Sequence, residues 1–379
     1  MTTTLPKITL DLRSEINSDR QLVLSLIEAD LPSPETDEVI VRVEATPINP
    51  SDMGLLFGAA DMSSATQSGS AERPVVTADV PERFMGAMAR RVDQSLAVGN
   101  EGSGVVIAAG DSSEAQALVG KKVAMFGGSM FTQFRCINVK NCLELPGNIT
   151  CEDGASAFVN PLTVLGFIDT LKKDGHSALM HTAAASNLGQ MLNRICIKDD
   201  IPLVNIVRHD EHVTLLKSQG AKYVVNSNSE TFIEELSEAA FETGATLGFD
   251  AIGGGKLAGQ MLTSMESAAS KTPGAYSRYG SKTLKQVYIY GTLDTSKTEV
   301  ARNFGFSWKM GGWLLFNYMD TLNQHEIKQL HDRVISELQT TFKSHYSKTV
   351  SLAEALSLES IKEYYKRSSG AKYLINPTR

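Results

Sequence analysis

The chain has 379 residues, 42% hydrophobic and 21% charged, so it has the composition of a globular protein and a length that favours two domains. A net charge of −7 without any lysine- or arginine-rich block excludes the electrostatic footprint of a dedicated nucleic-acid binder. No secretory signal precedes the first strand pattern, and no run of roughly 18 apolar residues predicts a membrane span. We therefore expect a cytoplasmic protein without nucleic-acid or membrane partners.

The four cysteines do not have the spacing of a metal site. No C-x-x-C pair occurs, whereas zinc requires closely clustered thiolates or imidazoles. We expect no metal, and we predict reduced, buried thiols as is usual for a cytosolic protein. The cysteines are Cys136, Cys142, Cys151 and Cys196.

The first third of the chain predicts a mainly β domain. Residues 37–48, DEVIVRVEATPI, alternate apolar and polar side chains and include many β-branched residues, which is typical of a half-buried strand. Pro50 ends this strand because proline has no N–H to donate to a sheet. Apolar segments broken by glycine at 101–110 and 120–128 predict further short strands, so we expect a barrel-like or sheet-rich domain.

Residues 59–97 interrupt this pattern. The segment begins with small, polar, turn-prone residues, and its second half, from Pro81 to Leu96, predicts a short helix. We interpret the whole segment as an excursion over the surface, either a lid over a cleft or a mobile loop without a role at the site.

From about residue 153 the pattern changes to alternating helices and strands. This alternation predicts βαβ units and a parallel sheet that is covered on both faces. The expected helices are 154–173, 187–199, 211–220, 229–241 and 255–265, and the expected strands are 177–181, 202–208, 221–226, 245–253 and 285–291.

The last part of the chain predicts two helices and a short final strand. Residues 324–342 have the periodicity of an amphipathic helix, and residues 351–377 predict a helix followed by a strand. Because a lone helix and strand cannot bury a core, we expect this tail to pack back on the first domain.

A phosphate-binding turn is predicted at Ala183–Gly189, between a predicted strand and a predicted helix. In such turns, free backbone N–H groups and the positive end of the helix dipole face a pyrophosphate. Glycines usually permit the tight turn and the close approach. Here Ala183 and Ser186 take two of the glycine positions, Gly189 keeps the last, and Asn187 can cap the helix. Taken alone, a turn of small residues is a weak signal.

The strand that follows the turn ends at Arg208, about 20 residues after Gly189. At this offset an acidic residue binds the ribose 2′-hydroxyl of NAD, whereas an arginine accommodates the 2′-phosphate of NADP. A guanidinium group has the permanent charge and the fork geometry that a phosphate requires. The combination of strand, turn, helix, strand and arginine favours NADPH as the cofactor.

Considered in order along the chain, these motifs resemble the zinc-independent quinone oxidoreductases of the medium-chain dehydrogenase/reductase superfamily. The resemblance implies an α/β protein with a GroES-like, mainly-β catalytic domain and a Rossmann domain with a doubly wound parallel sheet, and NADPH in the cleft between them. The implied domains are 1–157 with 322–379, and 158–321. The matching segments are 37–52, 98–106, 158–171, 177–226, 248–255, 287–291 and 370–375.

The resemblance also implies roles for individual residues. Asn49 and Thr163 would lie near the nicotinamide, the phosphate turn would hold the pyrophosphate, and Asn49 and Tyr290 are the candidates for a catalytic role. The implied cofactor-binding residues are Asn49, Thr163, Ala185, Ser186, Asn187, Leu188, Gly189, Arg208, Ile252, Gly253, Tyr290, Gly291 and Lys372.

The activity implied by the family is hydride transfer from NADPH to a quinone or an activated alkene, as in NADPH:quinone oxidoreductases that form homodimers. Zinc-dependent relatives have a cysteine near the position of Asn49 and a histidine at the position of Asn100. Because amide side chains replace both ligands, we expect chemistry that is independent of zinc.

Two alternatives remain open. Ser186, Asn187 and the arginine-ended strand also resemble mitochondrial-type enoyl thioester reductases, for which Arg90 and Arg91 could form a positive rim. Those enzymes carry a tyrosine after the NPSD segment, but no tyrosine occurs between Asp52 and Glu101 here. The other alternative is an NADPH-binding sensor or regulatory protein with little catalysis.

Overall fold

The computed structural model describes residues 6–272, 276–367, 370 and 372–379. The chain divides into two compact units, residues 1–159 with 334–379, and residues 160–333. The sequence places the boundaries at 157/158 and 321/322. The two divisions differ most around helix α11 (Gln324–Glu337), which the sequence assigns to the first domain and which the structure divides between the units.

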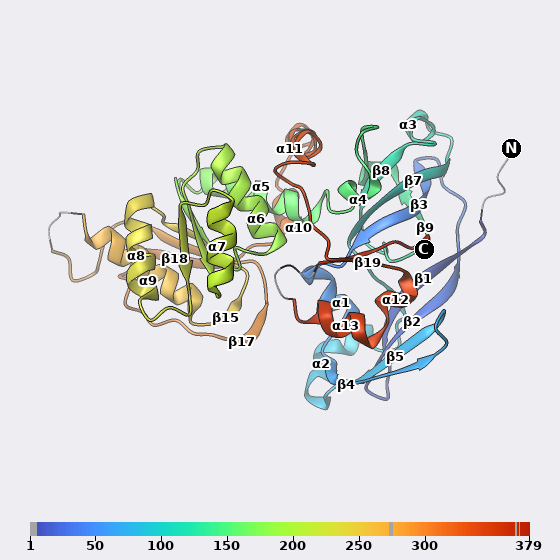
Figure 1. Ribbon diagram of the computed structural model, residues 1–379, viewed down its shortest axis with the longest axis horizontal. Coiled ribbons are helices and arrows are strands. Elements are labelled where there is room, and N and C mark those ends of the chain that lie inside the picture. The colour runs from blue at the N-terminus through green and yellow to red at the C-terminus, as the bar shows by residue number, and fades with distance from the viewer. Residues whose placement is uncertain (1–5, 273–275, 368–369, 371) are drawn as a thin grey trace. The chain divides into compact units, whose positions relative to one another are not determined.

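The first unit contains two mostly antiparallel sheets (Figure 1). One has the strand order β4-β5-β2-β1-β6, and the other has the order β10-β8-β7-β3-β20-β19, with β9 also paired to β3. The strands are β1 (Ile8–Ile16), β2 (Gln21–Asp30), β3 (Glu38–Pro47), β4 (Asp61–Gly69), β5 (Pro74–Asp79), β6 (Leu96–Ala97), β7 (Glu101–Ala109), β8 (Lys122–Phe126), β9 (Phe134–Asn138), β10 (Cys142–Glu144), β19 (Lys348–Val350) and β20 (Tyr373–Ile375). The helices are α1 (Met53–Phe57), α2 (Glu82–Met88), α3 (Ser113–Ala117), α4 (Cys151–Gly154), α12 (Leu352–Ala355) and α13 (Leu358–Tyr365).

The prediction of a surface excursion at 59–97 is wrong for its first half. Strands β4 and β5 form a hairpin, and β5 pairs with β2, so the segment extends the five-stranded sheet. The sequence signal for β5 was a short alternation of apolar and polar residues, in which Val76, Ala78 and Val80 are buried. The partner strand β4 has no such alternation, because it is an exposed edge strand and needs few apolar side chains. Its polar residues therefore resemble a surface loop. Helix α2 confirms the short helix expected in the second half.

The expected return of the tail to the first domain is confirmed. Strand β20 pairs antiparallel with the end of β3, at Thr46 and Pro47, and parallel with β19. Two aromatic residues, Tyr364 of α13 and Tyr373 of β20, are buried in the same core as Leu12 and Leu24 of the first sheet. The helix and the strand thereby bury apolar surface that neither could bury alone.

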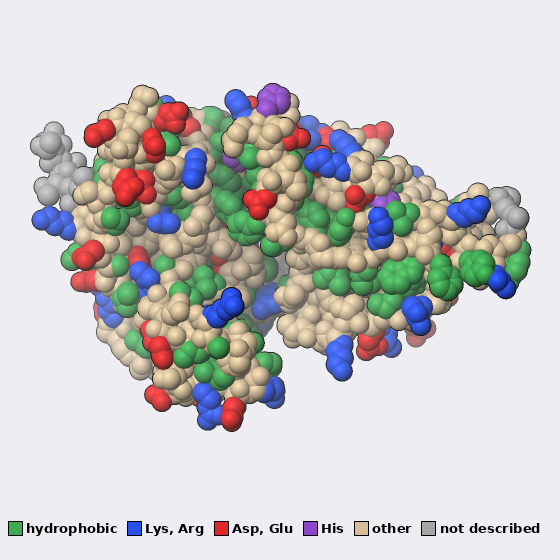
Figure 2. All heavy atoms as spheres, turned by 180° about the vertical axis from the view of Figure 1, so that it is seen from behind, with side chains coloured by type: hydrophobic (Ala, Val, Ile, Leu, Met, Phe, Trp, Pro, Cys, Tyr) green, Lys and Arg blue, Asp and Glu red, His purple; other side chains and the backbone are tan. Residues whose placement is uncertain are grey.

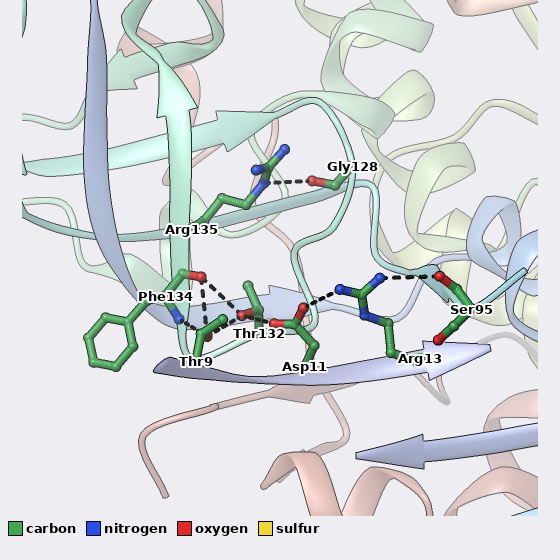
Figure 3. A network of polar contacts seen from close by, with 8 residues as sticks. All are labelled: Thr9, Asp11, Arg13, Ser95, Gly128, Thr132, Phe134 and Arg135. Atoms are coloured by element: carbon green, nitrogen blue, oxygen red, sulfur yellow. Dashed lines mark hydrogen bonds and ion pairs between the residues drawn. The ribbon is translucent and has the colours of Figure 1, made fainter. Parts of the chain in front are cut away.

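A polar network fastens β1 to the segment that precedes β9 (Figure 3). The Thr132 hydroxyl donates to Oδ1 of Asp11 over 2.6 Å and lies 2.7 Å from the Thr9 hydroxyl. Arg13 donates to Oδ2 of Asp11 over 2.9 Å and to the Ser95 carbonyl over 3.3 Å. Each oxygen of the buried Asp11 carboxylate therefore has a donor, as a charge inside a sheet requires.

The second unit is built around a six-stranded sheet whose pairings are all parallel, in the order β13-β12-β11-β14-β16-β18. A separate pair, β15 and β17, lies outside it. The strands are β11 (Leu179–His181), β12 (Leu203–Val207), β13 (Tyr223–Asn226), β14 (Leu247–Asp250), β15 (Gly253–Gly255), β16 (Lys285–Ile289), β17 (Asp294–Thr298) and β18 (Trp308–Gly312). The helices are α5 (Val159–Lys173), α6 (Asn187–Lys198), α7 (Asp210–Ser218), α8 (Phe232–Thr243), α9 (Leu257–Ser270), α10 (Leu315–Met319) and α11.

The strand order confirms the predicted doubly wound sheet. From β11 the chain moves outward through β12 to β13, and it then returns to β14 on the other side of β11 and continues to β16 and β18. Right-handed crossovers place α6 and α7 on one face, and α8 and α9 on the other, as Figure 1 shows. The change of direction between β11 and β14 is the point at which doubly wound sheets bind ligands.

Candidate cofactor and active site

The carboxyl edge of the parallel sheet gathers most of the predicted cofactor residues. Strands β11, β12, β14 and β16 end just before the phosphate turn, Arg208, Ile252 and Tyr290, respectively. Because these strands are parallel, the residues that follow them meet at one edge. Thr163 lies near the beginning of α5, which runs back toward the start of β11 and therefore begins on the side of this edge.

The phosphate turn has a backbone suited to an anion. Ala183 has a left-handed φ of 50°, which a non-glycine residue adopts at an energetic cost and which glycine fills in more typical turns. Ser186 is the N-cap of α6, and its hydroxyl accepts a hydrogen bond from the backbone N–H of Gly189 over 3.1 Å. The positive end of α6 therefore points into the turn.

Gly189 is required by close packing. A Cβ atom built on it would lie 2.2 Å from the carbonyl oxygen of Ala184. We expect Gly189→Ala to lower the free energy of unfolding by about 1–3 kcal/mol, because the helix must move away from the turn. Denaturant titration measures this change. Gly86→Ala in α2 is the matched control, since nothing lies within 4 Å of its Cβ position, and equal stability of the two variants would contradict the packing argument.

Arg208 is exposed at the end of β12. Its carbonyl oxygen accepts a hydrogen bond from Asn228, which fixes the backbone of the strand end. The nearby carboxylate of Asp210 accepts a hydrogen bond from Asn226 over 2.7 Å. His209 and His212 lie beside the arginine with their ring centroids 5.4 Å apart. This strand end can receive an anion.

Two residues that the sequence analysis overlooked connect β11 to β14. The hydroxyl of Thr182 donates to Oδ1 of Asp250 over 2.8 Å, and the same carboxylate accepts the N–H groups of Ile252 and Gly253. Asp250 is fully buried and holds the loop after β14 in place. The available signal was an acidic residue at the end of an otherwise apolar strand pattern.

The loops after β14 and β16 approach each other closely. A Cβ on Gly291 would lie 2.5 Å from the carbonyl oxygen of Ala251, and one on Gly253 would lie 2.7 Å from that of Gly291. Beside them is a pocket of about 360 Å³. Its lining residues are Ile289, Tyr290, Gly291, Thr292, Gly312, Trp313, Leu314 and Asn317.

Tyr290 has its hydroxyl group bound within the second unit. The hydroxyl lies 2.7 Å from Nε2 of His181, and both rings belong to a cluster with Phe167, Phe249 and Trp313. Burial raises the pKa of Tyr290, so its proton is harder to release than that of a free phenol. Its catalytic role stays a prediction.

His181 is completely buried, and burial lowers its pKa to about 3. A depressed pKa means that the unfolded chain, with a pKa near 6.5, binds the proton more readily than the folded one. The stability contributed by the neutral ring is therefore present at neutral pH and is lost as the pH falls below about 6.5. Between pH 7 and pH 5 we expect His181 to lower the free energy of unfolding by about 2 kcal/mol.

The measurement is a pair of denaturant titrations at pH 7 and pH 5 on the wild type and on His181→Gln. The variant is expected to lose less stability over this interval, because glutamine does not titrate. The same loss in both proteins would show that the histidine is not the group responsible.

The first unit contains a second, buried polar group around Asn49. The Asn49 side chain donates from Nδ2 to Oε1 of Glu101 over 2.9 Å, and its backbone N–H donates to Oδ2 of Asp52 over 2.7 Å. Asp52 also accepts the N–H of Asn100, so its carboxylate caps two backbone N–H groups. Burial raises the pKa of Asp52 to about 7. Sequence reasoning missed Glu101, whose signal was a carboxylate between glycines at the start of an apolar strand.

Lys372 belongs to the same group of residues. Its ammonium donates to the Ser156 hydroxyl over 2.8 Å, and that hydroxyl lies 2.8 Å from the Tyr346 hydroxyl. Burial lowers the pKa of Lys372 to about 8, and the negative charges of Glu101 and Asp52 oppose that shift. Among the predicted site residues, Asn49 and Lys372 therefore lie in the first unit and the others lie in the second.

Asn49 and Asn100, the two positions at which the resemblance implies metal ligands in zinc-dependent enzymes, belong to this amide and carboxylate network. Within the described residues, no group of three or more histidine, cysteine, aspartate or glutamate side chains could hold a metal ion. The four thiols are free, and burial raises the pKa of Cys136, Cys142 and Cys151 to about 12.

No described helix is long and apolar enough to cross a membrane.

The chain is similar to several known reductases. A protein of Mesorhizobium loti assigned as an NADPH:quinone reductase superposes with a TM-score of 0.73 at 23% identity, covering 99% of this chain and 100% of that one. The Etr1p/NADP/crotonyl-CoA complex superposes with a TM-score of 0.67 at 18% identity, covering 97% and 99%. Prostaglandin reductase-3 of Bos taurus is 25% identical over 191 residues, 46% of this chain and 49% of that protein.

The similarity in sequence is limited. The chain spans about half the length of prostaglandin reductase-3, and no family model matches it. The similarity in fold covers nearly the whole chain, and it agrees with the antiparallel sheets and the doubly wound parallel sheet described above. The chain therefore has the fold of these solved reductase structures, with the mixed α/β architecture that its sequence predicts.

Proposed function

We propose that the chain is an NADPH-dependent, zinc-independent oxidoreductase that transfers hydride to a quinone or an activated alkene. The observation that carries the proposal is the carboxyl edge of the parallel sheet. A phosphate turn with the N-terminus of α6 and an exposed arginine follow two adjacent strands there. This pair of features fits the pyrophosphate and the 2′-phosphate of NADPH.

Several features of the structure fit the cofactor. Gly189, Gly253 and Gly291 let the phosphate turn and the two loops pack closely, because a Cβ atom at each position would clash with neighbouring backbone. The pocket beside Tyr290 has a size suited to a planar ring. Oδ1 of Asn49 is a buried acceptor without a donor among the described residues.

Each predicted site residue would have a separate role toward the cofactor. Ala185 to Gly189 would bind the pyrophosphate, and Arg208 would bind the 2′-phosphate. Ile252, Gly253, Tyr290 and Gly291 would orient the nicotinamide, together with Thr163 and Asn49. Bound NADPH supplies the hydride. The apolar walls around Trp313 would exclude water from the transfer, and Lys372 would supply positive charge.

The chemistry of the acceptor is tested by NADPH oxidation with a quinone, an enone and an enoyl-CoA in parallel. We expect turnover with the quinone or the enone. Turnover with the enoyl-CoA alone would support the enoyl thioester reductase alternative, which the fold of Etr1p favours. NADPH binding without turnover of any acceptor would support a sensor or regulatory protein.

Two observations weigh against the enoyl-CoA alternative. No tyrosine follows the NPSD segment before Glu101. Arg91, one member of the expected positive rim, donates instead to the Gly54 and Leu55 carbonyls and to the Ser14 hydroxyl. Internal contacts occupy its guanidinium, which leaves Arg90 alone to meet a nucleotide.

We also propose that the protein is a cytoplasmic homodimer. Strand β18 is an edge of the parallel sheet, so one side of its backbone has no strand partner in the described part of the chain. Large apolar side chains flank it, with Phe306 78%, Leu314 51% and Phe316 53% exposed. Hydrophobic side chains are also conspicuous on the second unit, to which β18 belongs, in Figure 2. Light scattering should give twice the mass of the chain, and the monomer mass would reject the dimer.

A further inference from the structure

We propose that an exposed aromatic patch on the second unit is a docking surface for membranes that contain anionic lipids. The aromatic patch consists of Tyr276, Arg278, Tyr279, Lys282 and Phe306. These residues lie on two segments that are joined by backbone hydrogen bonds, the turn before β16 and the residues before β18. The inference goes beyond the proposed function and does not depend on it, because it concerns the attachment of the protein to a surface and not its chemistry.

The three rings of the aromatic patch are strongly exposed to water. Tyr276 is 94% exposed, Phe306 78% and Tyr279 54%. At one end of the second unit, Figure 2 shows hydrophobic side chains with lysine and arginine side chains among them. An aromatic ring gains much free energy when it leaves water, so a group of exposed rings marks a surface that another apolar phase or molecule covers.

The aromatic patch has a fixed backbone. The N–H of Phe306 donates to the Tyr279 carbonyl over 3.1 Å, which joins the two segments. Ser281 donates its backbone N–H and its hydroxyl to Glu266 over 2.7 and 2.6 Å, and the buried Lys285 binds the same carboxylate. Internal contacts therefore order the segment that carries the rings, and little conformational entropy remains to be lost when the patch docks.

The cations of the aromatic patch are available to an anionic partner. Arg278 lies over the Tyr279 ring, 4.7 Å from its centroid, and donates to the hydroxyl of that ring. Lys282 is exposed, and neither cation forms an ion pair within the described residues, whereas Lys271 and Lys285 are each paired with a glutamate. Exposed rings with polar tips beside unpaired cations suit the headgroup region of an anionic membrane.

Two other occupants fit the aromatic patch less well. In a two-fold contact centred on the patch, Arg278 and Lys282 of the two copies would lie against each other, and these like charges would repel. A single-stranded nucleic acid needs open ring faces on which its bases stack. Arg278 covers one face of Tyr279, and the Phe306 ring meets that ring at 78° with the centroids 6.1 Å apart. A bilayer surface requires no open face, because the rings enter it individually.

The test is co-sedimentation of the full chain with phosphatidylcholine vesicles, with and without phosphatidylserine. We expect the wild type to bind at least about fivefold more strongly when phosphatidylserine is present, because each cation at an anionic surface contributes about this factor. The double variant Tyr276→Ser, Phe306→Ser should bind the mixed vesicles about tenfold more weakly, since two rings no longer insert. The double variant Arg278→Glu, Lys282→Glu should lose the preference for phosphatidylserine.

Each double variant has a matched control. Phe316→Ser removes a ring that is 53% exposed on the same unit but outside the aromatic patch. Lys217→Glu reverses a charge at an exposed position in the last turn of α7. Both controls should bind vesicles as the wild type does. Because all the replaced side chains are exposed, every variant should keep the thermal midpoint of the wild type.

The opposite results are equally clear. A wild type that binds neither kind of vesicle would overturn the proposal, and so would equal binding by the patch variants and their controls. A loss of mass in light scattering of Tyr276→Ser, Phe306→Ser, with vesicle binding unchanged, would assign the patch to a second copy. Binding of a labelled single-stranded oligonucleotide by the wild type, without binding of vesicles, would assign it to nucleic acid. Turnover of NADPH tests the proposed function separately, and none of these outcomes depends on it.

Discussion

Replacement of Arg208 by aspartate is expected to weaken NADPH binding by about 100-fold and to change NADH binding by less than about threefold. The guanidinium at the end of β12 is exposed, and it would form charged hydrogen bonds to the 2′-phosphate, which NADH lacks. Aspartate removes these bonds and adds repulsion of the phosphate. It also resembles the acidic residue that binds a ribose hydroxyl in NAD-dependent proteins.

The measurement is a pair of titrations with NADPH and NADH that follow nucleotide fluorescence. Lys217→Asp is the matched control, because it makes the same charge reversal at an exposed position in the last turn of α7. It should change both affinities little. An equal loss of NADPH and NADH binding in Arg208→Asp would reject the assignment of the 2′-phosphate to this residue.

Lys285→Met is expected to lower the free energy of unfolding by about 3–5 kcal/mol. The Lys285 side chain is 0% exposed, and its Nζ lies 2.5 Å from Oε2 of Glu266, which is 10% exposed. Burial by itself would raise the pKa of Glu266, but hydrogen bonds from Lys285 and Ser281 lower it. Removing the lysine would leave a carboxylate inside the second unit without its counter-charge.

Denaturant unfolding of Lys285→Met at pH 7 measures the loss. Lys271→Met provides the comparison, because Lys271, the C-cap residue of α9, pairs with Glu238 of α8, and both side chains are more than one-third exposed. We expect that variant to lose less than about 1 kcal/mol. If the two variants were equally stable, the buried pair would contribute no more than an exposed one.

The second unit was largely predictable because its signals are local. Each strand and helix carries its own periodicity, and the phosphate turn and Arg208 follow from positions along the sequence. The hairpin of β4 and β5 escaped prediction because its stability comes from pairing with β2, far away along the chain. The polar residues of β4 do not by themselves predict this pairing between strands.

The polar contacts of the site were the least predictable part. The hydrogen bond between Thr182 and Asp250 joins residues from two strands, and Glu101 meets Asn49 from a distant segment. A single sequence identifies a charged residue in an apolar strand but not the partner that satisfies it. Asn49 was implied by resemblance, and only the folded chain shows which of its atoms is left to accept.

The pairing of β20 with β3 has a consequence for synthesis in the cell. Strand β3 is translated early. Its partner at Thr46 and Pro47 is β20, which is synthesised only when translation has reached residue 375. The second unit, which lies between them in the sequence, can complete its own sheet on the ribosome much sooner. Nascent chains of this protein therefore pass through a stage in which the second unit is complete while the edge of β3 at Thr46 and Pro47 still lacks its partner strand.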